Sequence, residues 1–349
     1  MSWDKAPIDL SKIKISTRKT GSKKEREISY REAIKEALYL ALKEDKRVFI
    51  FGEGVDDPGG TFGTTLNLHK EFGSDRVFDT PLCENTLTGI AIGSSLAGLR
   101  PVLVHMRTDF MLLSMDQLIN HAAKWKYMFG GKASVPIVVR AIIGGGWGSA
   151  AQHSQPLQSL FTHVPGLKVV MPSTAYDVKG LLLSSILDES PVIFIEHRWL
   201  YDYKDIVPKD PYLIPLGKAV LRKEGKDLTL ITNSFMTILA IEAAKRLEDE
   251  GINIEIVDLR TIKPLDYDLI LSSVKKTQRA IVLDFGYKFC GISSEISSFL
   301  MENALKFLKA PVSRIALPDI PTPASSVLEK IYYPNVENIV FEIKKLLKK

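Results

Sequence analysis

Several polar residues directly follow short apolar segments, where a fold can hold a reactive group. Glu53 comes after one such segment, Glu84 lies between a second segment and a helix-like stretch rich in small residues, and Phe110 lies just beyond a third. In open α/β sheets, ligands bind beyond the carboxyl ends of the strands. A carboxylate there can move a proton, but an acid at a helix start also interacts favourably with the helix dipole. The pattern alone leaves both explanations open for Glu84.

A histidine follows a glycine-rich loop further along the chain. Residues 144–148 read GGGWG, and His153 comes next within the stretch AAQHSQ. An imidazole titrates near neutral pH and could transfer a proton here, although a lone histidine can equally be structural. The loop has neither the GxGxxG spacing nor a following Lys-Ser/Thr pair, so it does not predict a phosphate cradle. Flexibility near a ligand or a partner explains the glycines equally well.

Two other groups of polar residues have simpler explanations. His163 lies in a turn before a strand-like segment, where a structural role is favoured. Asp56-Asp57 precede Pro-Gly-Gly, a combination that builds a surface turn more often than a metal site. The sequence has no GxSxG nucleophile elbow, so it does not indicate a serine hydrolase.

Short apolar segments alternate with helical patterns over residues 29–197. Ser29 and Glu32 have the spacing of a capping box, which should start the first helix. Strands that are apolar throughout predict a parallel sheet covered on both faces. We expect strands at 47–52, 76–79, 101–106, 136–141, 167–171 and 191–196, and helices at 85–99, 111–129, 156–162 and 174–187.

A second set of elements follows a break in this alternation. Residues 199–216 hold three prolines and several charges, the composition of a linker. Beyond them we expect strands at 228–232, 254–258, 280–284 and 313–316, and helices at 235–250, 266–274, 292–307 and 335–348. The predicted fold class is therefore α/β, with two doubly wound domains that meet near residue 210 and a basic arm over residues 1–27.

The position of the charges excludes one class of function. The 349 residues carry a net charge of +5, and residues 1–31 hold nine basic and four acidic side chains, which leaves 37 of each sign over residues 32–349. A neutral body with a short basic arm argues against a nucleic-acid-binding groove. Cys83 and Cys290 are too far apart in sequence to suggest a disulfide framework or a zinc site. No apolar run reaches the length of a membrane span, and the N-terminus shows no apolar signal segment, so we expect a cytoplasmic protein.

Taken together, these segments resemble the beta subunits of thiamine-diphosphate-dependent 2-oxo acid dehydrogenases. That family includes the pyruvate, branched-chain 2-oxo acid and acetoin enzymes, and the likeness covers about residues 28–349. It is carried by FGE at 51–53, DTPxxE at 79–84, AGLRP at 97–101, DQ at 116–117, QHSQ at 152–155, HxPGLKVV at 163–170 and DLRTIKP at 258–264.

The resemblance implies a division of labour between two kinds of chain. Residues 28–210 would form a thiamine-diphosphate pyrimidine-binding domain, and residues 211–349 a transketolase C-terminal domain. In this family a GDG…N motif on a separate alpha subunit holds the diphosphate and magnesium, and no GDG occurs here. The resemblance therefore implies half of an active site, completed in a heterotetramer of two alpha and two beta subunits.

The resemblance also implies roles for single residues. Glu84 would hydrogen-bond the pyrimidine ring of thiamine diphosphate and favour the tautomer that takes up the thiazolium proton. Phe110 would stack on that pyrimidine, and Glu53 would join an acidic relay between active sites. His153 would face the substrate and assist proton transfer or acyl transfer.

Many relatives also bind a structural cation, usually potassium, largely through backbone carbonyl groups. Ser190 stands where some relatives have asparagine. The matching positions for this possible potassium site are Ile137, Ser185, Asp188 and Ser190.

One segment departs from the family pattern next to the expected cofactor position. Relatives read roughly FMTFNFSMQAIDQ around the stacking aromatic, whereas residues 105–117 read HMRTDFMLLSMDQ. Thr108 replaces an aromatic residue, Leu113 replaces a glutamine, and Arg107 and Asp109 add charge. Pyruvate therefore does not follow as the substrate, and a larger, polar or phosphorylated 2-oxo compound is compatible with the segment.

The resemblance favours one function over two alternatives. The expected chain is the beta subunit of an oxidoreductase that decarboxylates a 2-oxo acid and passes the acyl group to lipoamide on a lipoyl acyltransferase core. The altered residues 105–113 motivate a split transketolase-like enzyme that transfers ketol units between sugars. A non-catalytic assembly subunit is the third possibility, and it predicts that replacing Glu84 leaves the activity of the complex intact.

Overall fold

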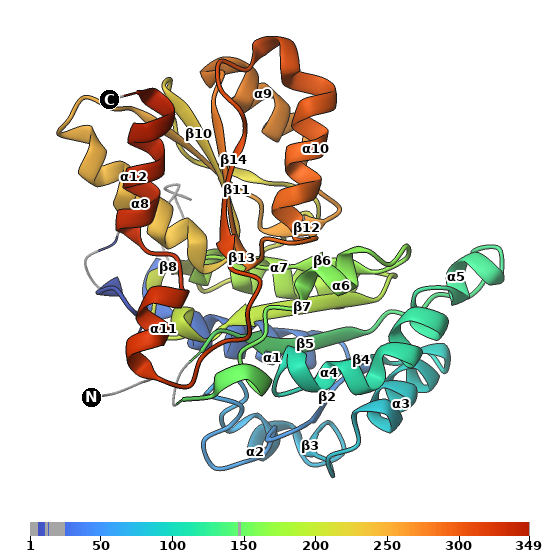
Figure 1. The fold of residues 1–349 in the computed structure, drawn as a ribbon. Helices are drawn as coiled ribbons and strands as arrows, with labels where there is room; N and C mark the ends of the chain where they lie inside the picture. Colours follow the sequence, from blue (N-terminus) through green and yellow to red (C-terminus); the bar gives the residue numbers. More distant parts are fainter. Residues whose placement is uncertain (1–5, 11–12, 14–24, 146–147, 349) are drawn as a thin grey trace. The chain divides into compact units, whose positions relative to one another are not determined.

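The computed structural model describes residues 6–10, 13, 25–145 and 148–348, which fall into two compact units (Figure 1). Of the described residues, 25–144 and 160–216 form the N-terminal unit. The C-terminal unit comprises 6–10, 13, 145, 148–159 and 217–348. Within their described residues, each unit has a sheet of mostly parallel strands, which confirms the predicted α/β fold class. The predicted domain bounds, 28–210 and 211–349, stay a prediction.

The sheet of the N-terminal unit is parallel and deeply buried. Over the described part of this unit, neighbouring strands follow the order β6-β7-β5-β4-β2-β3. Every side chain of β4, β5 and β7 is buried, so both faces of the sheet are covered. The strands are β2 (Val48–Gly52), β3 (Val77–Asp79), β4 (Arg100–Val104), β5 (Val138–Ile143), β6 (Lys168–Val170) and β7 (Val192–His197).

Helix α1 (Tyr30–Glu44) begins as the sequence predicts. The backbone N–H of Ser29 donates to the Glu32 carboxylate at 2.7 Å, and the Ser29 hydroxyl oxygen accepts the Glu32 N–H at 3.4 Å. Helix α1 packs against α7 (Ala175–Leu187). Helix α3 (Glu84–Leu96) packs against two short segments, residues 112–114 and 117–122. Short helices are α2 (Leu68–Phe72), α6 (Gln158–Thr162) and the 3₁₀ turn η5 (Arg198–Leu200).

The prediction of one regular helix over residues 111–129 is wrong. The backbone forms α4 (Thr108–Met111), the 3₁₀ turn η2 (Leu112–Ser114), the π-helix η3 (Gln117–Ala122) and α5 (Trp125–Met128). In the π-helical part the Ala123 N–H donates to the Leu118 carbonyl oxygen at 3.0 Å, which widens the turn. The apolar periodicity continues across these changes, so the sequence pattern does not reveal them. Such π segments are frequent at functional sites.

The stretch predicted as a linker contains a strand. Strand β8 (Lys204–Pro208) pairs antiparallel with β1 (Glu25–Ser29), and Tyr201 and Tyr203 just before it are buried. The linker prediction for residues 199–216 is therefore wrong over its first half. Exposed and buried residues alternate over residues 204–207, but the buried members include Asp205 and the exposed ones include Ile206, so burial does not follow polarity here. Residues 25–27, assigned to the polar arm from sequence, belong to β1.

The C-terminal unit has a second sheet with helices packed in pairs. Over its described residues the strand order is β14-β13-β10-β11-β9, and β9 is antiparallel to β11. Helix α8 (Phe235–Glu248) packs against α12 (Val336–Leu347), and α9 (Tyr267–Thr277) against α10 (Ile292–Ala304). The strands are β9 (Val220–Lys223), β10 (Leu228–Thr232), β11 (Ile254–Asp258), β13 (Ala280–Tyr287) and β14 (Ser313–Leu317).

Shorter elements complete the C-terminal unit. They are strand β12 (Thr261–Lys263), helix α11 (Ser326–Tyr332) and the 3₁₀ turns η4 (Ala150–Gln152) and η6 (Leu305–Phe307). Among the helices of the described ranges, none combines the length and apolar character needed to cross a membrane.

Candidate functional site

Glu84 is the first residue of helix α3. Its side chain is largely buried, with 9% of its surface exposed. The Thr88 hydroxyl donates to the Glu84 carbonyl oxygen at 2.8 Å, which closes the first turn of the helix around it. A carboxylate held at a helix N-terminus and largely shielded from water interacts strongly with any group that approaches it. The structure thus places Glu84 as the sequence pattern suggests.

Glu53 directly follows strand β2 and is held by the neighbouring strand β4. Its N–H donates to the Val104 carbonyl oxygen at 3.1 Å, and its Oε2 accepts the Met106 N–H at 3.0 Å. Gly52 makes this approach possible: its φ is +132°, and a Cβ there would lie 2.2 Å from the Val104 carbonyl oxygen. Glu53 is only 4% exposed, and its Oε1 has no hydrogen-bond partner among the described residues.

A fully buried histidine links the two acidic residues. His105 Nδ1 lies 3.6 Å from Glu53 Oε1, and His105 Nε2 lies 3.1 Å from Thr88 Oγ1. Through Thr88 this connection reaches the carbonyl group of Glu84. The N-terminal unit therefore brings Glu53 and the start of the Glu84 helix together at the carboxyl ends of its strands, where open α/β sheets bind ligands.

The predicted stacking residue, Phe110, lies on α4 and is partly exposed. The preceding Arg107 is buried, and its Nη1 donates to the Gly144 carbonyl oxygen at 2.8 Å. His197 is also buried here, and a Cβ on Gly144 would lie 2.8 Å from its Cε1. Burial, reinforced by the Arg107 charge, lowers the pKa of His197 to about 3, so its imidazole is neutral at physiological pH.

His153 belongs to the C-terminal unit, whereas Glu53, Glu84 and Phe110 belong to the N-terminal unit. It follows η4 and is exposed. The segment that carries it is held by Gln158, whose side-chain amide donates to the Asp284 carboxylate at 3.2 Å. Asn233 donates to the same carboxylate oxygen at 3.2 Å. Asp284 is completely buried, and burial raises its pKa although these amides oppose the shift. Residues 146–147 of the glycine-rich loop lie outside the described residues.

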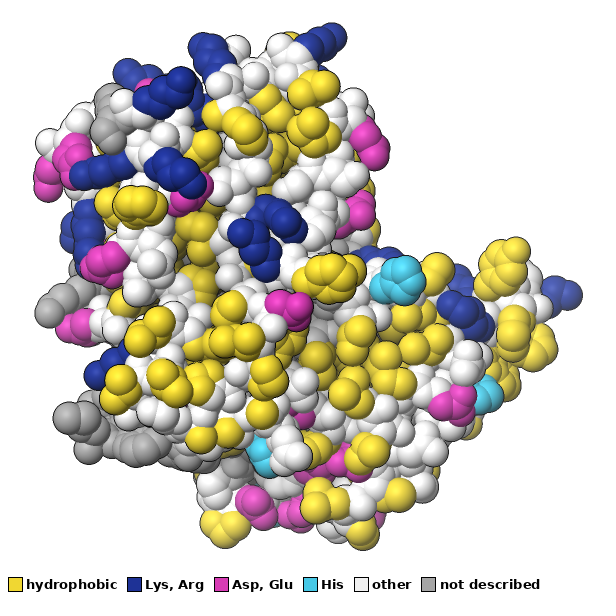
Figure 2. All heavy atoms as spheres, in the orientation of Figure 1, with side chains coloured by type: hydrophobic (Ala, Val, Ile, Leu, Met, Phe, Trp, Pro, Cys, Tyr) yellow, Lys and Arg dark blue, Asp and Glu magenta, His cyan; other side chains and the backbone are white. Residues whose placement is uncertain are grey.

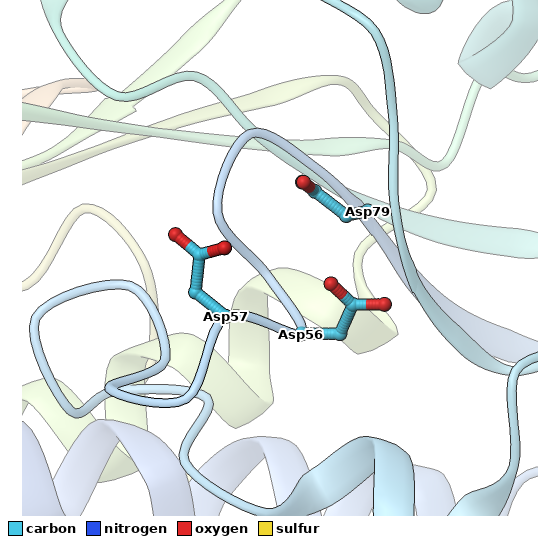
Figure 3. A group of neighbouring side chains, drawn as sticks. All are labelled: Asp56, Asp57 and Asp79. Carbon is cyan, nitrogen blue, oxygen red and sulfur yellow. The ribbon is translucent and has the colours of Figure 1, made fainter.

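Asp56 and Asp57 adopt the predicted surface turn and meet Asp79 from the end of β3 (Figure 3). The three carboxylates are exposed and lie close enough together to share a cation. However, Asp79 Oδ1 already accepts the Gly54 N–H at 2.7 Å, and the Gly60 N–H donates to the Asp57 carbonyl oxygen at 2.7 Å. These bonds explain the cluster as a turn, and we assign no metal to it.

The four residues expected at a potassium site surround the C-terminal end of α7. The carbonyl oxygen of Ile137 accepts the Val192 N–H at 2.9 Å, and that of Ser185 accepts the Asp188 N–H at 3.3 Å. The Asp188 carboxylate accepts the Ser190 N–H at 2.8 Å. The chain also supplies its own cations here: Lys168 contacts the Asp188 carboxylate at 2.5 Å, and Arg100 donates to the Asp188 carbonyl oxygen at 3.2 Å.

The sequence analysis did not single out Thr88, His105 or Asp284. A signal was available for His105, because it directly follows β4 just as Glu53 follows β2. Asp284 lies inside a strand, and Thr88 inside a helix, where no pattern separates a hydrogen-bonding residue from a packing residue.

The N-terminal unit exposes large apolar side chains around this region. Figure 2 shows hydrophobic side chains gathered over the segments around α3, α4 and α5. Exposed apolar patches of this kind mark interaction surfaces in soluble proteins. The most exposed members are Leu82, Ile90, Leu113, Tyr127 and Met128.

Comparison with known proteins agrees with this architecture. The model described as the transketolase pyrimidine-binding domain matches residues 26–204, and the model of the transketolase C-terminal domain matches residues 217–339. A solved structure described as split gene transketolase, inactive beta4 tetramer, has a TM-score of 0.76 at 23% identity and covers 92% of this chain and 98% of that one. This likeness shows the fold, that of transketolase-type proteins.

Sequence relatives define the family more narrowly. The chain is 44% identical to the beta subunit of acetoin:2,6-dichlorophenolindophenol oxidoreductase of Cupriavidus necator, over 93% of this chain and 98% of the relative. It is 43% identical to the pyruvate dehydrogenase E1 beta subunit of Bacillus subtilis, over 90% and 97%. It is 41% identical to the 2-oxoisovalerate dehydrogenase beta subunit of the same organism, over 91% and 98%. The chain belongs to this family of oxidoreductase beta subunits, as the sequence motifs predicted.

Proposed function

We propose that the chain is the beta subunit of a heterotetrameric, thiamine-diphosphate-dependent 2-oxo acid dehydrogenase. The enzyme would decarboxylate a 2-oxo acid oxidatively and pass the acyl group to lipoamide. The observation that carries this proposal is the buried Glu84 at the start of α3, linked through Thr88 and His105 to a second buried acid, Glu53. The names of the relatives support the reaction class and favour it over ketol transfer.

The residues of the N-terminal unit fit the pyrimidine half of the cofactor. Glu84 offers a shielded carboxylate to a ring nitrogen, and Phe110 offers a flat apolar surface close to buried groups. When bound, thiamine diphosphate supplies the electron sink for decarboxylation. Glu84 would hold the pyrimidine ring by a hydrogen bond to its nitrogen, and Glu53 would join an acidic relay behind it. His153 would act on the substrate side, where an imidazole suits proton transfer near neutral pH.

The diphosphate and its magnesium would be held by an alpha subunit that carries the GDG motif. The apolar surface around α3, α4 and α5 supports such a partner, because a subunit interface covers exposed side chains such as Tyr127, which is 89% exposed. A lipoyl acyltransferase core would be the next partner. The relatives act on different substrates by name and differ little in identity, so the 2-oxo acid stays open. The buried charge of Arg107 favours a substrate with a polar or anionic group.

Potassium binding by Ile137, Ser185, Asp188 and Ser190 is a weaker part of the proposal. The carbonyl oxygens there already accept N–H groups, and Arg100 and Lys168 bring positive charge to the same place. We therefore expect potassium to raise the melting temperature of the complex only slightly over sodium at equal ionic strength. No step of the proposed reaction depends on it.

The decisive experiment uses the complex co-expressed with its alpha subunit. Reduction of an artificial electron acceptor by a panel of 2-oxo acids should be measured for the parent and for Glu84→Gln. Loss of a direct acid–base group should lower kcat roughly 10²- to 10⁴-fold with assembly unchanged. The matched control is Glu295→Gln, an exposed glutamate in the first turn of α10, which should keep parental activity.

Three outcomes would contradict the proposal. Full activity of Glu84→Gln would indicate a non-catalytic assembly subunit. Turnover of ketose phosphates without turnover of 2-oxo acids would indicate a split transketolase-like enzyme. Activity of the beta chain alone would remove the need for an alpha partner.

A further inference from the structure

The chain segment that carries His153 is held by the C-terminal unit at both of its ends. Its described residues, 145 and 148–159, group with that unit, whereas residue 144 before it and residue 160 after it group with the N-terminal unit. His153 is exposed near the middle of this segment. The contacts that hold the two ends therefore decide where its imidazole is placed.

One end of the His153 segment is held by Gln158, which contacts the last part of β13. The Gln158 side-chain amide donates to Asp284 Oδ1 at 3.2 Å, and both residues are completely buried. A Cβ on Gly286 would lie 2.6 Å from Gln158 Nε2, so a side chain there would displace the amide. The pairing of β13 with β14 changes register between Leu283 and Tyr287. Such irregularities re-aim side chains and are frequent next to active sites.

The other end of the segment, Gly145, lies against helix α11 and the residue that follows it. A Cβ on Gly145 would lie 2.5 Å from Glu329 Oε1 and 2.7 Å from the Tyr333 hydroxyl oxygen. The Tyr333 ring stacks on Phe285, with centroids 5.4 Å apart and planes 10° from parallel. Phe285 is the middle residue of the stretch 284–286. Both ends of the segment therefore depend on the same three residues of β13.

The chain between His153 and Gln158 is short and packed. Ser154 and Gln158 have no exposed surface, and Pro156 between them is also buried. A proline has a fixed φ, which removes one of the rotations through which this stretch could adjust. A displacement of Gln158 should therefore be passed on to His153, five residues earlier, rather than absorbed on the way.

We propose that residues 284–286 of β13 form a positioning site for His153. Asp284 and Gly286 hold one end of the segment, and Phe285 supports the other end through the ring stacked on it. The importance of this site for turnover rests on the role of His153 in the proposed function. The attachment of the segment does not, because it follows from contacts inside the C-terminal unit.

The first test is Gly286→Ala in the complex with the alpha subunit. The added methyl group should push the Gln158 amide away from Asp284 without changing a charge. Because a misplacement of about 1 Å can cost up to about 10²-fold in rate, we expect kcat to fall roughly 10- to 100-fold with KM unchanged. The matched control is Gly59→Ala, where a Cβ meets nothing within 4 Å, and it should keep parental kcat. Parental kcat in Gly286→Ala would overturn the proposal.

A second variant keeps the test decisive if Gly286→Ala does not fold. Gln158→Ala removes the anchoring amide and adds no atoms, so it should lower kcat in the same way. Parental kcat in Gln158→Ala would then overturn the proposal.

A double variant separates positioning from a merely structural role. His153→Gln alone should lower kcat roughly 10²-fold or more, as expected for loss of an acid–base group. Adding Gly286→Ala to His153→Gln should lower kcat no further, because the imidazole that it misplaces is already absent. Losses that multiply would show that Gly286→Ala acts elsewhere, and would overturn the positioning role.

Hydrogen exchange of the complex tests the attachment without turnover. In Gly286→Ala, backbone amides of residues 148–157 should exchange at least about tenfold faster than in the parent, while those of α8 stay unchanged. Unchanged exchange over residues 148–157 would overturn the proposed attachment. Full activity of His153→Gln would instead contradict the role of His153 in the proposed function, and faster exchange in Gly286→Ala would still support the attachment.

Discussion

Two buried carboxylates, Glu53 in the N-terminal unit and Asp284 in the C-terminal unit, have different hydrogen-bonding surroundings. Glu53 in the N-terminal unit faces a histidine and one backbone N–H. Asp284 in the C-terminal unit faces the neutral amides of Gln158 and Asn233. A partner that can carry positive charge compensates a buried anion directly, whereas amides compensate it only through hydrogen bonds.

This difference separates a group suited to chemistry from one suited to positioning. Glu53 lies 3.6 Å from His105, which contacts Thr88 on the Glu84 helix. Asp284 has no titrating partner in the hydrogen bonds described, and it fixes Gln158, close in sequence to His153. Within its own unit, Glu53 is held beside His105, whereas Asp284 holds the segment that contains Gln158.

The largest expected effect is on stability and comes from deleting the Asp284 carboxylate. Asp284→Ala leaves two buried amides without an acceptor, which should lower the free energy of unfolding by about 3 kcal/mol. Asp284→Asn keeps an acceptor oxygen and removes the buried charge, so it should change stability by about 1 kcal/mol or less. Urea denaturation of the complex measures both.

An exposed aspartate provides the control for this series. Asp268→Ala, in the first turn of α9, should stay within about 0.5 kcal/mol of the parent. If Asp284→Asn proved as damaging as Asp284→Ala, the negative charge itself would stabilise the unit. The contrast drawn here between Asp284 and Glu53 would then be wrong.

A double-mutant cycle tests the Glu53–His105 pair, for which we expect a smaller change in the free energy of unfolding. The variants are Glu53→Gln, His105→Gln and their combination. For two polar side chains that are almost fully buried and lie 3.6 Å apart, we expect a coupling energy of about 2 kcal/mol. The parallel cycle of Asp284→Asn with Gln158→Ala should give a coupling energy of about 0.5 kcal/mol. The reason is that Asp284→Asn removes the charge but keeps an oxygen that can accept the hydrogen bond. Equal coupling in both cycles would remove the distinction between the two acids.

The sequence predicted most of the fold because buried strands and amphipathic helices repeat with clear periods. Strands β10 and β11 have the predicted bounds, and the capping box at Ser29 starts α1. The irregular helices between residues 108 and 128 could not be predicted, since changes in hydrogen-bond spacing leave the apolar pattern intact. Strand β8 was missed because Asp205 is buried and Ile206 is exposed, so its sequence does not show the apolar/polar alternation of a half-buried strand.

The site was only partly predictable for a related reason. Acids after strands can be found from position alone, and Glu53 and Glu84 were found in this way. The partners of a buried acid come from distant parts of the chain: His105 is 52 residues beyond Glu53, and Gln158 is 126 residues before Asp284. Only the fold brings these pairs together, so their chemistry is visible only in the structure.

The last prediction uses His197, a buried histidine near Arg107. Burial and Arg107 lower its pKa from 6.5 to about 3, so between these values the unfolded chain binds a proton that the folded chain does not. Stability due to the neutral ring is complete above about pH 6.5 and is lost as the pH falls toward 3. The slope should reach about 1 kcal/mol per pH unit.

His197→Asn isolates this contribution, because an asparagine oxygen can still accept the Trp199 N–H but does not titrate. The variant can be less stable at pH 7, so the measured quantity is the slope of the unfolding free energy between pH 6.5 and 4 rather than its value. The slope should be shallower in His197→Asn than in the parent, and unchanged in His163→Asn, where an exposed histidine is replaced. Parallel slopes in all three proteins would mean that the folded chain accepts the proton at His197.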